Sequence, residues 1–273
     1  MPDDLLLPRI LLTNDDGFDA IGLTLLAKIA ATLAQEVWIV APTEDQSGAS
    51  QKLSLRQPLQ IIPRGERAYA VTGTPSDCIA LALDVLMADA RPSLVLSGVN
   101  PSANIADANN LSGTVGAAMT ALMLGIPAIA ISQQSAKKGK TPWATTEIVL
   151  PAVLQRLLRE GWRKETCLSV NIPDYPPDEI KGYGWAMQGH KNIPRVLSSR
   201  RINPRGEEYY WLSLEEKEPV PLPNGEAALL SRGEIAITAL SLSHSLEIAK
   251  PFVRFKPQAE ILDEPLDDLI HDV

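Results

Sequence analysis

Cysteine, histidine and aromatic side chains are scarce in this chain of 273 residues, which has 2 cysteines, 3 histidines and 5% aromatic residues. Cys78 and Cys167 are too few and too far apart for a disulfide framework or a zinc knuckle. None of the polar segments described below contains a histidine, since the three stand at His190, His244 and His271. A histidine triad and a histidine-rich metal site are therefore poorly supported.

Long apolar runs and an excess of positive charge are also missing. The longest apolar stretch, Ala117–Ile131, is interrupted by Thr120, Gly125 and Pro127 and falls short of the roughly 20 residues of a membrane helix. The N-terminal segment carries acids where a secretory signal would carry Lys or Arg, so we expect a cytoplasmic protein. The net charge of −8, from 33 acidic and 25 basic residues, predicts neither nucleic acid nor a membrane as a partner.

Short apolar runs alternate with amphipathic stretches over the first two-thirds of the chain. The predicted strands are Arg9–Thr13, Val37–Ala41, Leu94–Leu96, Ala128–Ile131 and Cys167–Ile172, with a hairpin made of Leu53–Ile62 and Tyr69–Thr72. The predicted helices are Ile21–Ala34, Pro75–Met87, Gly113–Gly125 and Ala144–Glu160. This alternation predicts an α/β fold with a Rossmann-like, mostly parallel sheet and helices on both of its faces.

The composition changes after residue 172. Residues 173–232 are rich in proline with short, scattered strand patterns, and Ile235–Leu240 has the pattern of one returning strand. We therefore divide the chain into a Rossmann-like core, residues 1–172, and an excursion, residues 173–273. The excursion comprises a β-rich arm, the returning strand and an acidic tail, which we expect to be loose from Asp263. The arm's aromatic side chains, Trp185 and Tyr209–Trp211, suit a subunit interface, a platform for a base, or a small core under the arm.

Side chains with oxygen atoms follow three of the predicted strands, at the point where each strand ends. They belong to the segments 14–17 (NDDG), 47–50 (SGAS) and 97–100 (SGVN). Ligands of an open parallel sheet bind beyond the carboxyl ends of its strands, so we expect these segments to meet in one crevice. The adjacent carboxylates of Asp15 and Asp16 repel one another unless a cation neutralises them. With a serine hydroxyl and an asparagine carbonyl, they form a donor set suited to Mg²⁺ or Mn²⁺.

A fourth segment, Ser112-Gly113-Thr114, opens a predicted helix. Free N–H groups and the positive end of a helix attract phosphate, and glycine allows a close approach to the backbone. All of these residues also have an ordinary structural interpretation. The two aspartates and Ser112 suit helix N-caps, and Ser47 and Asn100 suit turns. The residues alone leave both interpretations open.

Motifs of other enzyme classes are missing or incomplete. The sequence has no Walker P-loop and no Gly-x-Ser-x-Gly segment, and Gly182-Tyr183-Gly184 lacks the later glycine of a dinucleotide fingerprint. A phosphatase of the haloacid-dehalogenase type places Asp-x-Asp-Gly after a strand and uses the first Asp as its nucleophile. Aligning Asp16-Gly17 with that pattern puts Asn14 at the nucleophile position, and an amide cannot form an aspartyl-phosphate.

Five motifs occur in one order along the chain: NDDG at 14–17, SGAS at 47–50, GTPSDC at 73–78, SGVN at 97–100 and SGTV at 112–115. Together they closely resemble the SurE family of stationary-phase survival proteins, which are metal-dependent nucleotidases. The likeness is dense from Ile10 to Ile131 and weaker at residues 171–174, 203–206 and in the returning strand. A run of motifs in this order over more than a hundred residues is specific, whereas any one of them alone is not.

The resemblance implies a divalent-metal-dependent phosphomonoesterase, a 5'-nucleotidase that releases phosphate from nucleoside 5'-monophosphates. The resemblance also implies that nucleoside 3'-monophosphates and short polyphosphate are further substrates. It implies catalysis by Asp15 and Asp16, and one divalent cation per subunit, Mg²⁺ or Mn²⁺, bound by Asp15, Asp16, Ser47 and Asn100. It implies that the phosphate binds at Asn104, Ser112, Gly113 and Thr114. It also implies a homodimer or homotetramer that exchanges C-terminal segments.

The chain departs from the family pattern at three positions. Ser102 and Ala106 stand where glycines are expected, and Leu111 stands where Tyr or His is usual. None of these changes removes a predicted metal ligand. They motivate an alternative, a nucleotide-binding or regulatory paralogue with the same fold and without catalysis. A role in nucleic-acid binding would rest on basic residues at 137–140 or 200–205, and such short clusters are typical of solvated loops.

Overall fold

The structure of the protein is a computed structural model that describes residues 7–135, 140–215 and 217–245. Its α-helices are α1 (Ile21–Ala30), α2 (Pro75–Leu81), α3 (Gly113–Met123), α4 (Trp143–Glu160) and α5 (Glu226–Ser231). Short helical turns of other types are η1 (Ala82–Leu86), η2 (Ala106–Asn110) and η3 (Pro177–Glu179). The strands are β1 (Leu7–Thr13), β2 (Ala34–Pro42), β3 (Ile61–Gly65), β4 (Ala68–Val71), β5 (Leu94–Asn100), β6 (Ala128–Gln133), β7 (Thr166–Ile172), β8 (Tyr183–Trp185), β9 (Arg195–Ile202), β10 (Glu208–Glu215) and β11 (Ile235–Ser241).

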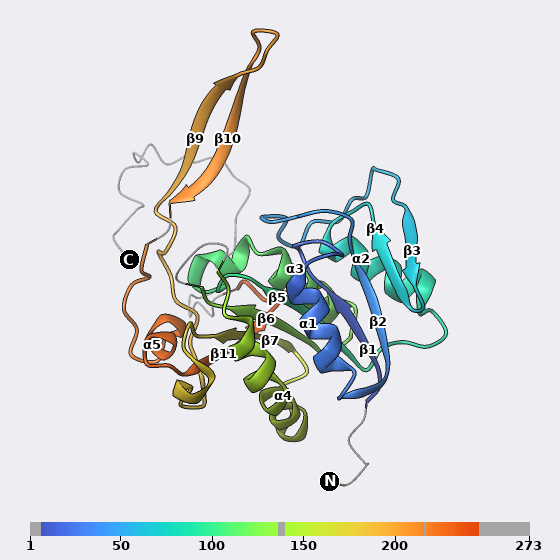
Figure 1. Cartoon of the computed structure of the whole chain (residues 1–273), viewed down its shortest axis with the longest axis vertical. Coiled ribbons are helices and arrows are strands. Elements are labelled where there is room, and N and C mark those ends of the chain that lie inside the picture. Colours follow the sequence, from blue (N-terminus) through green and yellow to red (C-terminus); the bar gives the residue numbers. More distant parts are fainter. Residues whose placement is uncertain (1–6, 136–139, 216, 246–273) are drawn as a thin grey trace, which may run out of the picture. The chain divides into compact units, whose positions relative to one another are not determined.

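Most of these strands form a nine-stranded sheet in the order β3-β4-β2-β1-β5-β6-β7-β11-β8 (Figure 1). The strands from β4 to β7 in this order run parallel, whereas β3 and β11 pair antiparallel with β4 and β7. The predicted α/β fold with a mostly parallel sheet is confirmed. From β1 the chain first continues to β2 on one side of it and later returns to β5 on the other side. A switch of this kind opens a crevice beyond the carboxyl ends of β1 and β5, where α/β proteins bind ligands.

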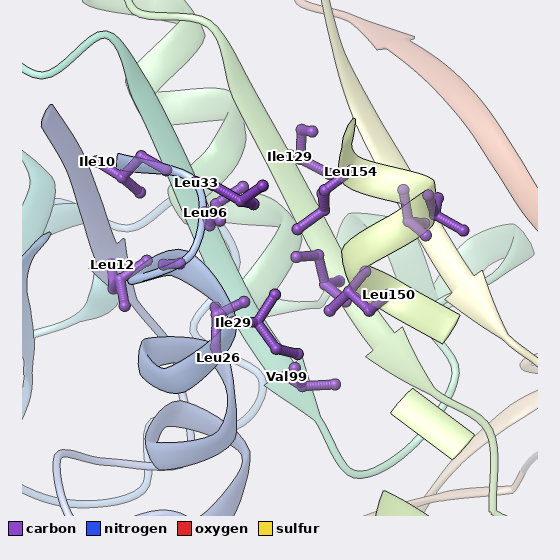
Figure 2. Packing of buried hydrophobic residues seen from close by; sticks show 14 of the residues in the cluster. Ile10, Leu12, Leu26, Ile29, Leu33, Leu96, Val99, Ile129, Leu150 and Leu154 are labelled. Carbon is purple, nitrogen blue, oxygen red and sulfur yellow. The ribbon is translucent and has the colours of Figure 1, made fainter. Parts of the chain in front are cut away.

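Helices cover both faces of the sheet, as predicted. On one face, leucine and isoleucine side chains of α1 and α4 pack on β1, β5 and β6, including Leu26, Ile29, Leu150 and Leu154 (Figure 2). On the other face, α2, η1 and α3 pack on alternate residues of the same strands. The alternation is visible in β1, where Ile10 and Leu12 face one cluster and Leu11 faces the other.

Both cysteines are buried, free thiols within or beside the second cluster. Burial raises the pKa of the Cys78 thiol well above its usual range and raises that of Cys167 to about 12. Each therefore stays a protonated packing residue at neutral pH.

Two predicted elements have the wrong boundaries because local contacts compete with the preference that the apolar pattern indicates. The first helix stops at Ala30 instead of Ala34, since the N–H groups of Thr32 and Leu33 turn back to the carbonyls of Ile29 and Ala30. The predicted hairpin strand from Leu53 begins only at Ile61. The segment before it is attached to α2 instead: the Thr74 hydroxyl donates to the Lys52 carbonyl at 2.6 Å, and Asp77 accepts from the Ser54 N–H at 2.8 Å.

Two further boundaries differ near the expected site. The third core strand does not end at Leu96 but continues to Asn100, which pairs with Ser132 of β6 after an irregularity in the ladder. The helix from Pro75 is α-helical only to Leu81 and then continues as the π-helical turn η1. The motif SGVN is therefore part of a buried strand rather than of a loop.

The arm contains a hairpin, β9–β10, that forms a two-stranded sheet of its own (Figure 1). Tyr209, Tyr210 and Trp211 on this hairpin are 43%, 57% and 65% exposed, so the interpretation of these aromatics as a small core is wrong. The returning strand is confirmed as β11, which joins the main sheet. Residues up to Leu242 form one compact unit, and a boundary at residue 172 stays a prediction. The predicted loose tail from Asp263 lies outside the described residues.

Candidate active site at the carboxyl ends of β1 and β5

A tight turn after β1 places two aspartates at the edge of the sheet. Gly17 adopts a φ of +99°, which an L side chain rarely takes, and its carbonyl accepts a hydrogen bond from the Asn14 side chain at 2.8 Å. The next N–H, that of Phe18, donates to the Pro42 carbonyl at the end of β2 at 2.7 Å. Asn14 thus has a structural role in the turn. The turn leaves Asp15 only 4% exposed and Asp16 half-buried.

The N-terminus of α3 lies directly against Asp15. The Thr114 hydroxyl donates a hydrogen bond to Asp15 Oδ1. A Cβ at Gly113 would lie 2.8 Å from the Asp15 Cβ, so only glycine fits between them. Ser112 is the N-cap of α3, with its Oγ accepting from the Val115 N–H at 3.1 Å. The segment predicted to bind phosphate is therefore in direct contact with Asp15.

The two carboxylates are electrostatically unfavourable as they stand. Burial is the main cause that raises the pKa of Asp15, against hydrogen bonds from Thr114 that lower it. Burial, followed by the charges of Asp15 and Asp45, raises the pKa of Asp16 to about 7. Within residues 7–135, 140–215 and 217–245, no Lys or Arg forms an ion pair with either aspartate. A divalent cation would relieve this repulsion, so the donor set fits a hard metal ion.

The loop after β2 approaches the same point. Its Gln46 N–H donates to the Asp15 carbonyl at 2.7 Å, and the Ser47 N–H donates to Asp45 Oδ1 at 2.7 Å. On the α3 side, a Cβ at Gly116 would lie 2.0 Å from the Ser50 carbonyl oxygen, so the loop and the helix are in close backbone contact. The loop that carries Ser47 thus contacts Asp15 through the backbone of Gln46, and a metal-binding role of the Ser47 hydroxyl stays a prediction.

Asp45 is a third carboxylate in this region that the motif analysis did not identify. Its charge acts on both Asp15 and Asp16, and its side chain shapes the turn that holds Ser47. Its position two residues before Ser47, in the same polar segment, is the signal that could have found it. In the described ranges, no three Asp, Glu, His or Cys side chains form a metal-binding group. Serine and asparagine oxygens would therefore have to complete a cation site.

Asn100 lies at the end of β5, the strand next to β1. It is 9% exposed, and its Nδ2 donates to the carbonyl of Ser102 at 2.7 Å and to the hydroxyl of Ser102 at 3.1 Å. Its Oδ1 accepts no hydrogen bond from any residue that the structure describes, and Asn100 forms none with the two aspartates. Ser102, at a position where the family pattern has glycine, thus orients the Asn100 side chain and leaves Asn100 Oδ1 available to a ligand.

Asn104 belongs to a buried polar network. Its Nδ2 donates to the Ser132 hydroxyl at 2.9 Å, and its backbone N–H donates to Asn171 Oδ1 at 2.8 Å. The Asn171 side chain returns a hydrogen bond to the Asn104 carbonyl at 3.0 Å. In the described part of the chain, Asn104 forms no hydrogen bond with the aspartates or Ser112, so its contact with a phosphate stays a prediction.

A cavity of about 360 Å³ opens between the segment after β5 and the arm. Its lining combines the apolar side chains of Ala103, Ile105 and Pro219 with polar groups of Ser102 and Asn192. Because Ser102 also holds Asn100, the cavity lies beside the candidate metal site. Its volume falls in the range of small-molecule sites.

Comparisons with known proteins give one consistent result. A family model described as "Survival protein SurE" matches residues 10–195. The chain is 45% identical over 240 residues to "5'-nucleotidase SurE 1" of Burkholderia lata, which covers 88% of this chain and 93% of that relative. It is 41% identical over 236 residues to "5'-nucleotidase SurE" of Parvibaculum lavamentivorans, covering 86% of this chain and 85% of the relative.

The fold is similar as well. The crystal structure of the SurE protein from Aquifex aeolicus superposes with a TM-score of 0.74 at 32% identity, covering 87% of this chain and 95% of that one. The resemblance seen in the ordered motifs, the matched family model and the shared fold agree over most of the chain. This protein belongs to the SurE family.

Proposed function

We propose that this protein is a divalent-metal-dependent phosphomonoesterase, a 5'-nucleotidase that hydrolyses nucleoside 5'-monophosphates to nucleoside and phosphate. Its relatives from Burkholderia lata and Parvibaculum lavamentivorans are named for this reaction. The observation that carries the proposal is the pair of adjacent aspartates, of which Asp15 is buried against the N-terminus of α3, so that a candidate cation site adjoins a candidate anion site. Nucleoside 3'-monophosphates and short polyphosphate are proposed as further substrates.

One Mg²⁺ or Mn²⁺ ion per subunit would be held by oxygen atoms of Asp15, Asp16, Ser47 and Asn100. These are hard donors, and a cation at the aspartates would offset the burial and the like-charge repulsion that raise the pKa of both carboxyl groups. When bound, such an ion polarises a phosphate ester and makes a bound water more acidic.

The protein's own groups supply orientation and proton transfer. The start of α3 and Asn104 would bind phosphate oxygens, since the positive end of a helix stabilises the charge that develops on a phosphoryl group. Thr114 fixes the orientation of Asp15 by its hydrogen bond. The two aspartates are the candidates for accepting a proton from the attacking water, because their carboxylates would stand beside the ion that binds this water. The cavity beside Ser102 would take the nucleoside.

We also propose that the active protein is a homodimer or homotetramer with exchanged C-terminal segments, located in the cytoplasm. The exposed aromatic side chains of β9–β10 support an interface, because tyrosine and tryptophan are enriched at such surfaces. In the described part of the chain, no helix has the length and apolar character needed to cross a membrane.

Phosphate release tests the proposal. The purified protein is incubated with nucleoside 5'- and 3'-monophosphates and a short polyphosphate, with Mg²⁺, with Mn²⁺ or with EDTA. We expect metal-dependent release that is fastest with a 5'-monophosphate and absent with EDTA. No release from any substrate by the folded, metal-supplied protein would overturn the proposal. Nucleotide binding without release would instead support the non-catalytic paralogue suggested by the changes at Ser102, Ala106 and Leu111.

A further inference from the structure

One buried carboxylate near the candidate site accepts four hydrogen bonds from three separate segments. Glu226, the first residue of α5, is 1% exposed. Its Oε2 accepts from the N–H groups of Ala106 at 2.7 Å and Gly189 at 3.1 Å. Its Oε1 accepts from Asn109 Nδ2 and the Thr238 hydroxyl, both at 3.1 Å. The carboxylate therefore joins η2, the arm and β11.

These donors stabilise the charge of Glu226 without a cation. Among the described residues, no Lys or Arg forms an ion pair with it. Burying a carboxylate is unfavourable unless hydrogen bonds replace its hydration, and here both oxygens are supplied with two donors each. An apolar side chain would fill this space without the unfavourable free energy of burying a charge. It could not, however, accept a hydrogen bond from the backbone N–H of Ala106.

Ala106 is a residue that needs such support. Its φ of +54° lies in the left-handed region, which disfavours a residue with a Cβ. Besides the bond to Glu226, its carbonyl accepts from Gln188 Nε2 at 2.9 Å. The neighbouring Asp107 N–H donates to Asn192 Oδ1 at 2.9 Å. The turn at Ala106 is therefore held from the side of the arm by several hydrogen bonds, with the carboxylate at their centre.

The same turn leads directly into the predicted phosphate-binding segment. The Ser112 N–H donates to the Ala108 carbonyl at 3.0 Å, so η2 fixes the entry to α3. The Asn110 carbonyl accepts from the Ser50 hydroxyl at 2.6 Å, which connects η2 to the loop that carries Ser47. Displacing η2 would therefore move the start of α3. The Ser47 end of that loop is held separately, because the Gln46 N–H donates to the Asp15 carbonyl.

We propose that Glu226 is a positioning residue for substrate binding: it holds the turn at Ala106 so that residues 104–112 present the phosphate-binding groups correctly. This inference rests on the proposed function and deepens it. Glu226 lies outside the metal site, so it acts on nucleotide affinity rather than on metal affinity.

The test compares Glu226→Ala with Glu226→Gln, and adds the double variant Glu226→Ala with Ala106→Gly. Glutamine keeps one oxygen for the Ala106 and Gly189 N–H groups. Its amide nitrogen would face Asn109, whose Oδ1 is buried without a hydrogen-bond partner among the described residues and could accept from it after the Asn109 amide turns over. Glycine at position 106 adopts the left-handed conformation without strain and so needs less support.

We expect Glu226→Ala to raise KM for a nucleoside 5'-monophosphate about tenfold, as loss of a charged hydrogen bond would, with a smaller change in kcat. Glu226→Gln should stay within about threefold of the parent protein, and Ala106→Gly should recover most of the loss. The affinity for Mn²⁺ should stay within about twofold, since no metal ligand changes. The control is Glu234→Ala, which removes a glutamate that pairs with Arg232 at the surface and should change neither constant.

Two results would overturn the inference. One is an unchanged KM in folded Glu226→Ala protein, and the other is a loss of Mn²⁺ affinity as large as the loss of nucleotide affinity. If the parent protein releases no phosphate, the proposed function fails, and hydrogen exchange still tests the positioning role of Glu226 on its own. The amides of residues 106–112 should then exchange about tenfold faster in Glu226→Ala than in Glu226→Gln, because the turn loses its central acceptor. Equal exchange in both variants would contradict the positioning role by itself.

Discussion

Asp16 lies half-buried beside two other carboxylates, and its proton affinity follows from that environment. Burial and the charges of Asp15 and Asp45 raise its pKa from 3.8 to about 7. Since the pKa is higher in the folded state than in the unfolded state, the folded protein binds this proton more tightly. The resulting stabilisation is complete below about pH 4 and is lost as the pH rises through about 7.

This pH dependence predicts a difference between the metal-free protein and its Asp16→Asn variant. Asparagine is neutral at every pH, so in EDTA the two proteins should differ less in Tm at pH 5 than at pH 8. At pH 8 the variant should melt roughly 2–6 °C higher, because it lacks the buried charge. Thermal unfolding followed by circular dichroism measures both values. A Tm difference that does not change between pH 5 and pH 8 would contradict the assigned environment of Asp16.

The same substitution should have the opposite effect on function. Asp16→Asn should weaken Mn²⁺ binding at least about tenfold and slow phosphate release at least about a hundredfold, because one charged oxygen ligand is lost. Calorimetric titration with Mn²⁺ and the release assay measure the two effects. Asp19→Asn is a matched control, since Asp19 is an exposed aspartate paired with Arg64 and both properties should persist. Near-normal metal-dependent activity in Asp16→Asn would remove Asp16 from the site.

At the residue level, the sequence predicted the groups that stand in motifs and missed those that act over long distances in the chain. Asp15 and Asp16 could be assigned because they follow a strand in a sheet whose ligands bind at that edge. Glu226 could not, because its partner Ala106 lies 120 residues away. Asp45 was missed although it is close to Ser47, since its influence on the aspartates depends on how the loop folds over β1.

At the level of elements, α3 combines a capping role with the proposed phosphate role in one residue. Ser112→Ala should lower the free energy of unfolding by about 1 kcal/mol, because the cap on the Val115 N–H is lost. Ser112→Asp keeps a capping oxygen and should retain that stability, while its charge repels a phosphate and raises KM. Urea unfolding and steady-state kinetics of the two variants measure this separation. Equal KM values in Ser112→Asp and the parent protein would show that the phosphate binds elsewhere.

Apolar runs identified the central strands well, whereas element ends depended on contacts that a local pattern does not contain. The runs that form β6 and β7 were found because both are buried on two faces. The segment from Leu53 resembles a strand locally, yet its start forms hydrogen bonds with Thr74 and Asp77 at the beginning of α2. The polar motif SGVN does not look like a strand in the sequence. It nevertheless continues β5 as a buried strand, because pairing with β6 stabilises it.

On the scale of the whole molecule, the β9–β10 hairpin bears large apolar side chains that are exposed in the single chain. Trp211 and Leu212 are 65% and 72% exposed, which is unfavourable in water unless another surface covers them. Replacing both by serine should reduce the assembly of the proposed homodimer or homotetramer. Light scattering after gel filtration measures the mass. An unchanged mass in the variant would exclude the hairpin as an interface, and a monomeric parent protein would contradict the proposed assembly.

The central claim is that one divalent cation binds at the carboxyl ends of β1 and β5, next to the start of α3. Crystals grown with Mn²⁺ and phosphate test it most directly, because anomalous scattering locates manganese independently of the atomic model. We predict one peak per subunit within bonding distance of oxygen atoms of Asp15, Asp16, Ser47 and Asn100, with phosphate between that peak and Gly113. A manganese peak at another place, or none at saturating Mn²⁺, would contradict the account.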